Sequence, residues 1–123
     1  MKTSVIISII ASATLFGCSN AATSISNQKE QSYICQNKAL AGGWSASDVT
    51  PEAKQAIALV IEKMGDDAEL KRIDLVRIQI VSGMNYAVQF TLKNGEQWHA
   101  IVYRNLSNEY SIVEPAKLGI LCQ

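Results

Sequence analysis

The sequence lacks an excess of charge of either sign and contains only one histidine, His99. Its 11 basic residues balance its 11 acidic residues and form no basic stripe or polybasic run, which argues against nucleic acid as a partner. A lone histidine without neighbouring ligands is typical of a structural position in a strand rather than of a metal site. The sequence also lacks a carboxylate pair, a phosphate-binding glycine loop and a nucleophile motif. We therefore expect a protein that is not an enzyme and that binds neither a metal nor a cofactor.

Hydrophobic runs long enough to cross a bilayer as a helix are lacking as well. A shorter apolar stretch, Val5–Phe16, follows a positively charged start and precedes small residues, which is the layout of a secretory signal. Leu15–Cys18 resembles a bacterial lipobox, in which the cysteine is lipidated and becomes the first mature residue. Ordinary cleavage after Ala21 or Ala22 is the alternative. Either route predicts an exported protein.

The length of 123 residues suits one small domain behind these export features. We expect a signal peptide over residues 1–17, a flexible tether over residues 18–32 and the domain over residues 33–123. The tether is polar and shows no hydrophobic periodicity. Acylation of Cys18 would fix the protein to a membrane, as a bacterial envelope lipoprotein at the outer membrane or the periplasmic face. Without acylation we expect a secreted or periplasmic protein.

Cysteine is scarce, and only Cys35 and Cys122 remain once Cys18 is acylated or removed. An even pair in an exported protein predicts a disulfide. In the chain-entropy model, closing a loop of this length contributes about 4 kcal/mol to stability. The competing interpretation is a catalytic Cys35 paired with His99. It is disfavoured because no neighbouring residue in the sequence activates either side chain.

One segment has the features of an amphipathic helix. Thr50, Pro51 and Glu52 are typical of a helix start, and Gly65 is typical of a helix end. Between them, six apolar residues fall on one helical face: Ala53, Ala56, Ile57, Val60, Ile61 and Met64. The sequence therefore predicts a helix over residues 51–64 that buries one stripe.

After this helix the apolar period changes to two, which predicts antiparallel strands. A change of parity predicts a β-bulge near Leu75–Val76, and Asn94–Gly95 predicts a two-residue type I′ hairpin turn. The third strand is expected over residues 98–106, and Pro115 is expected to interrupt the last one. The fold class is therefore α+β, with a single N-terminal helix packed across a curved antiparallel sheet of four to five strands. The other face of the sheet is expected to stay partly solvated.

Three motifs stand out in this order: Gly42–Gly43 before the helix, Gln79–Gly83 with the pattern Q-x-V-x-G, and Leu106–Ser107 at a later turn. Together they resemble the cystatin superfamily, and its stefin branch most closely, in a bacterial lipoprotein-type version. The resemblance covers about residues 39–114. The sequence departs from the family in three ways. Ser107 stands where stefins usually have proline, the Cys35–Cys122 pair does not match the disulfides of secreted cystatins, and a lipid anchor is foreign to the animal members.

The resemblance implies a reversible, non-covalent inhibitor of papain-like cysteine proteases. An N-terminal trunk and two hairpin loops would occlude the active-site cleft. The implied protease-binding residues are Leu40, Ala41, Gly42, Gly43, Gln79, Ile80, Val81, Ser82, Gly83, Leu106 and Ser107. We expect a monomer, with a dimer that exchanges the first hairpin as the alternative. The missing proline also leaves open a lipid-anchored cystatin-fold module for binding or adhesion, without inhibitory activity.

Overall fold

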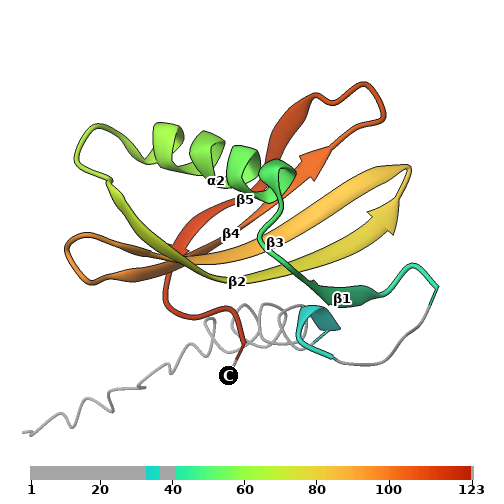
Figure 1. Cartoon of the computed structure of the whole chain (residues 1–123), viewed down its shortest axis with the longest axis horizontal. Coiled ribbons are helices and arrows are strands. Elements are labelled where there is room, and N and C mark those ends of the chain that lie inside the picture. Colours follow the sequence, from blue (N-terminus) through green and yellow to red (C-terminus); the bar gives the residue numbers. More distant parts are fainter. Residues whose placement is uncertain (1–32, 37–40, 123) are drawn as a thin grey trace, which may run out of the picture.

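The structure is a computed structural model that describes residues 33–36 and 41–122. The expected signal peptide, the tether and Cys18 lie outside these residues. The described part contains β1 (Trp44–Ser47), α2 (Pro51–Met64), β2 (Leu70–Val81), β3 (Gly83–Leu92), β4 (Gln97–Arg104) and β5 (Tyr110–Leu118). The strands form one antiparallel sheet in sequence order, and α2 lies across one face of it (Figure 1). This arrangement confirms the predicted α+β class, with five strands.

Helix α2 begins and ends at the residues that the sequence predicts. The Thr50 backbone is extended, and its Oγ1 accepts a hydrogen bond of 3.1 Å from the amide of Ala53. Pro51 fills the first position, where a missing N–H costs nothing. Gly65, with φ of 108°, ends the helix. These local interactions fix both ends of α2 independently of the sheet.

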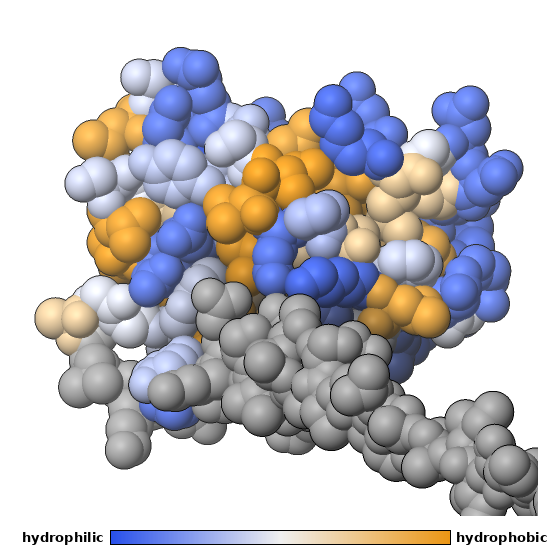
Figure 2. All heavy atoms as spheres, turned by 180° about the vertical axis from the view of Figure 1, so that it is seen from behind, coloured by the Kyte–Doolittle hydropathy of each residue, from blue (hydrophilic) through white to orange (hydrophobic). Residues whose placement is uncertain are grey.

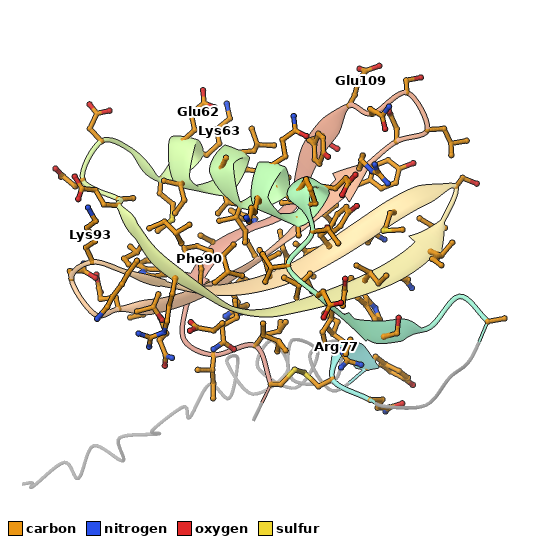
Figure 3. The ribbon with its side chains drawn as sticks, viewed as in Figure 1. Glu62, Lys63, Arg77, Phe90, Lys93 and Glu109 are labelled. Carbon is orange, nitrogen blue, oxygen red and sulfur yellow. A yellow bond between two sulfur atoms is a disulfide. The ribbon has the colours of Figure 1, made fainter. Side chains whose placement is uncertain are left out.

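The main core fills the space between α2 and the face of the sheet that carries it, here called the helix face. Eleven buried residues form it: Ala53, Ala56, Ile57, Val60, Val76, Tyr86, Val88, Phe90, Leu92, Ala100 and Val102. Figure 3 shows Phe90 reaching between sheet and helix, where it is completely buried. Burying a large apolar side chain contributes about 1.5–3 kcal/mol, so this layer supplies most of the driving force for folding.

The β-bulge lies one residue before its predicted place. The pairing of β2 with β3 shifts register between Leu70 and Arg72 and again between Ile73 and Leu75. The second shift leaves Asp74 out of the ladder, where its Oδ2 accepts a hydrogen bond of 2.6 Å from the Thr91 hydroxyl. The extra residue is therefore held by its own side chain.

The predicted type I′ turn at Asn94–Gly95 is wrong. The amide of Leu92 donates to the Glu96 carbonyl at 2.9 Å, so the loop has three residues, and only Gly95 among them has a positive φ. This geometry is typical of a type I turn followed by a glycine bulge. The Asn94 Oδ1 accepts from the amide of Glu96 at 2.9 Å, which favours the wider loop.

Pro115 does not interrupt the last strand, as the sequence had suggested, because β5 runs through it. Strand β5 is at the edge of the sheet, where a residue without an N–H leaves no partner unpaired. The pairing shifts register between His99 opposite Lys117 and Ile101 opposite Glu114, so Pro115 also falls within a bulge.

The face of the sheet opposite α2, here called the back face, is more covered than expected. Ile34 and Leu121 are buried on it against Ala87. Ile34 belongs to the first described residues of the chain, and Leu121 belongs to the C-terminal tail that follows β5. The predicted disulfide joins these two segments, with the Cα atoms of Cys35 and Cys122 5.6 Å apart (Figure 3). Two short segments, cross-linked to each other, thus close a second apolar cluster.

Replacing the cap residue tests how far α2 depends on its own end. Thr50→Ala removes the acceptor for the Ala53 amide and should lower the free energy of unfolding by about 1 kcal/mol. Thermal unfolding should show this as a drop of about 4–8 °C in Tm. Thr50→Ser keeps the hydroxyl and should stay close to the original Tm. Equal losses for both variants would contradict the capping role.

Candidate functional site

The three motifs singled out in the sequence lie at one end of the sheet. Val81 pairs with Gly83 and Met84 pairs with Arg104, so the β2–β3 and β4–β5 turns point the same way. Trp44 pairs with Gln79, which brings the start of β1 to this end as well. Figure 1 shows the start of β1, the β2–β3 turn and the β4–β5 turn in a row at this end, with the β2–β3 turn in the middle. We call residues 41–43, 79–83 and 106–107 the loop end; Leu40 lies outside the described residues.

The β2–β3 turn can be this tight only with glycine at position 83. Gly83 has φ of 109°, and a Cβ there would lie 2.3 Å from the Arg104 carbonyl oxygen and 2.9 Å from the Tyr103 hydroxyl. The Tyr103 hydroxyl also donates a hydrogen bond to the Ser82 carbonyl. The turn is therefore pressed against β4 and fixed to it.

Gln79 connects the N-terminal segment to the β2–β3 hairpin. Its Nε2 donates to the Gly42 carbonyl at 2.9 Å, and its Oε1 accepts from the Asn85 Nδ2 at 2.9 Å. Both groups of the amide are therefore used within the protein. Gln79 acts as a brace between the segment that carries Gly42 and the β2–β3 hairpin.

The β4–β5 turn is held by Asn105, a residue that we did not assign to the site from the sequence. Its Oδ1 accepts from the amides of Ser107 and Glu109, each at 2.9 Å. Asn108 completes the turn with a positive φ of 62°. An asparagine that bonds to the backbone two residues on is a known turn former, so a turn-based reading could have identified it. This side chain restricts the turn although proline is missing at position 107.

The tips of the loop end are apolar and exposed. Leu106 is 81% exposed, Ile80 67% and Val81 43%. Figure 2 turns the molecule round, so that the loop end lies at the left, and shows separate apolar side chains along that outline. Three protruding aliphatic side chains with no charge among them can insert into an apolar cleft but offer no acid, base or nucleophile.

Arg104 ties the base of the loop end together electrostatically. Its guanidinium lies 5.9 Å from the centre of the Tyr86 ring, and its Nη1 donates to the Asn108 Oδ1 at 3.4 Å. Burial raises the pKa of the Tyr86 hydroxyl above its usual value, and the charge of Arg104 partly opposes that rise. The ring therefore stays neutral under physiological conditions and serves as a platform for the arginine.

Cys35 and His99 form no catalytic pair. Cys35 is oxidised in the disulfide, and His99 Nδ1 lies 2.9 Å from the Gly119 carbonyl, where it helps to hold the C-terminal tail. Within residues 33–36 and 41–122, no group of three or more His, Cys, Asp or Glu side chains could hold a metal ion. The same residues contain no helix that is long and apolar enough to span a membrane.

A pair of glycine variants isolates the contact between the β2–β3 turn and β4. Gly83→Ala and Gly95→Ala both place a Cβ at a positive φ, but only the first meets atoms within 4 Å. Gly95→Ala should therefore cost about 1–2 kcal/mol, from backbone strain alone. Gly83→Ala should cost at least about 1 kcal/mol more, because the Arg104 strand must move. Urea unfolding measures both losses, and equal values would contradict the close approach.

Comparison with known proteins assigns the chain to no family. No family model matches the sequence. A search of curated proteins finds no match either. The function must therefore be argued from the geometry of the loop end and from the motifs that form it.

Proposed function

We propose that the chain is a reversible, non-covalent inhibitor of papain-like cysteine proteases and not an enzyme. The observation that carries this proposal is the row formed by Gly42–Gly43, Val81–Gly83 and Leu106–Ser107 at one end of the sheet. These segments are far apart in the sequence. The resemblance to cystatins implies that the same three segments act together in a protease cleft, and their common location is what such an action requires.

The chemistry of the tips suits a cleft that binds peptides. Ile80, Val81 and Leu106 are exposed in the free protein. Their burial against an enzyme would therefore contribute favourable free energy to binding without disturbing the core. Apolar surface removed from water contributes roughly 25 cal/mol per Å². Gly83 and Ser82 keep the central tip narrow, since neither carries a large side chain. Such a tip can enter a groove that would exclude a broader turn.

The rigidity of the loop end supports tight binding. Association costs translational freedom and the ordering of interface loops, so loops that are already ordered bind at a lower cost. Each of the three segments is held by a side chain that does not itself form the tip. Gln79 holds the segment with Gly42, Tyr103 holds the β2–β3 turn, and Asn105 holds the β4–β5 turn.

The setting of this activity is part of the same proposal. A disulfide is expected to persist in an oxidising compartment, which supports export. Cleavage after residue 17 and acylation of Cys18 would anchor the domain to a membrane of the bacterial envelope. The expected tether over residues 18–32 would then let the domain reach a protease. An inhibitor so placed would act on proteases outside the cytoplasm.

Titration of papain with the purified protein tests the proposal. The original protein should inhibit at nanomolar concentration, and Leu106→Asp should weaken inhibition about tenfold to a hundredfold, because it places a charge in an apolar contact. Leu118→Asp is the matched control. Leu118 is also exposed, at 62%, but it pairs with Trp98 and therefore lies toward the opposite end of the sheet. It should leave inhibition unchanged.

The outcomes separate the two candidate functions. Inhibition that is lost with Leu106→Asp and kept with Leu118→Asp supports the proposal. No inhibition by the original protein at micromolar concentration would contradict it and favour a lipid-anchored binding or adhesion module with the same fold. An equal loss in both variants would show that the loop end is not the binding surface.

A further inference from the structure

The segment that carries Gly42 is held at both of its ends by one buried side chain. The Arg77 Nη2 donates to the Gln36 carbonyl at 2.7 Å and lies 3.4 Å from the Trp44 carbonyl. Arg77 is only 4% exposed, and Figure 3 shows it on the side of the sheet away from α2. Gln36 and Trp44, which lie eight positions apart in the sequence, therefore meet at the same guanidinium.

A second attachment lies directly before this point. Cys35 is joined to Cys122, and the neighbouring Ile34 is buried on the back face. Cys122 itself belongs to a tail that the sheet holds firmly. The Leu121 amide donates to the Gln89 Oε1 at 2.9 Å, and the Gly119 amide donates to the Gln97 carbonyl at 2.7 Å. The disulfide thus connects Cys35, through the tail, to the middle of the sheet.

Neither attachment is needed to complete the main core. Arg77 and the disulfide lie on the back face, whereas the main core lies under α2. Hydrogen bonds from a charged donor to carbonyls are among the stronger ones, and a buried guanidinium is costly unless its donors are used. Two strong constraints thus act on either side of the loop-end residues 41–43: the disulfide holds Cys35, and Arg77 contacts both Gln36 and Trp44.

We propose that Arg77 and the Cys35–Cys122 disulfide are positioning residues for protease binding, an inference that rests on the proposed function. They hold the chain at Cys35, Gln36 and Trp44, so that Gly42 reaches Gln79 from a base that is fixed on both sides. The first of the three binding segments is then anchored at both ends and is not a free N-terminal arm. A segment anchored at both ends has fewer conformations to lose on binding than a free arm, so we expect its complex to dissociate more slowly.

The test compares variants of the two attachments with a control of similar stability loss. The disulfide is removed by Cys35→Ser with Cys122→Ser, and the guanidinium by Arg77→Met, with Arg77→Lys as the conservative replacement. Val60→Ala is the control, because it weakens the main core under α2 and touches neither attachment. Papain is activated with a thiol beforehand and freed of it, so that the inhibitor's disulfide stays oxidised during the measurement.

Three quantities are measured for each variant: Tm, the rate of dissociation from papain, and amide hydrogen exchange in the peptide covering residues 33–47. The disulfide-free protein and Arg77→Met should dissociate about tenfold faster and exchange faster in that peptide. Arg77→Lys should restore part of both. Val60→Ala should lower Tm without changing either. Should the disulfide-free protein not fold, the two Arg77 variants decide.

The outcomes distinguish this inference from the proposed function. If the original protein does not inhibit papain, the proposed function fails, and hydrogen exchange still decides whether the two attachments order the segment that carries Gly42. Unchanged exchange in the variants would overturn the positioning role whatever papain shows. Faster exchange with an unchanged dissociation rate would overturn it too, since the attachments would then order the segment without affecting the binding of papain.

Discussion

The loop end depends on the register in which β3 pairs with its two neighbours. The register places Val81 opposite Gly83 and Met84 opposite Arg104. Both turns therefore lie at the same end of the sheet and at similar positions along the strand direction. A slip of one residue would move Phe90 from the helix face to the back face. The buried layer under α2 therefore fixes the positions of the tips, although none of its residues reaches them. In this protein the core specifies the geometry of the loop end through hydrogen-bonded register.

The back face of the sheet needs a cover other than a helix, because the sheet has only α2 and α2 lies on the opposite face. A helix can cover only one face, and the other would expose Ala87, Leu75 and Ile101 to water. The chain covers them with two short segments. The C-terminal one is held by hydrogen bonds to Gln89 and Gln97, and the disulfide links the N-terminal one to it. The same cross-link holds Cys35 beside Gln36, whose carbonyl accepts a hydrogen bond from Arg77.

Local sequence signals predicted those parts of the fold that local interactions determine. Helix α2 was placed correctly because Thr50 and Pro51 define its start without help from the sheet. The prediction of a two-residue turn at Asn94 was wrong because the Asn94 side chain accepts a hydrogen bond from the Glu96 amide, which favours the three-residue loop. The motifs of the site were found by their pattern, but Arg77 and Tyr103 were not assigned to it. Their partners, Gln36 and Ser82, are distant in the sequence, so no spacing rule connects them.

The polar side chains of the loop end contribute little to the stability of the fold, and in the proposed inhibitor their main effect is on binding. Gln79 and Asn105 make hydrogen bonds near water, where exchanging a protein partner for a water molecule changes the free energy of unfolding by only about 1 kcal/mol. The same bonds remove alternative conformations of the tips, and that loss of freedom would otherwise be required each time a partner binds. A sequence can therefore keep its core and lose the arrangement of its loop end through a few polar substitutions. The proposed inhibition thus depends on Gln79, Tyr103 and Asn105 as well as on the fold.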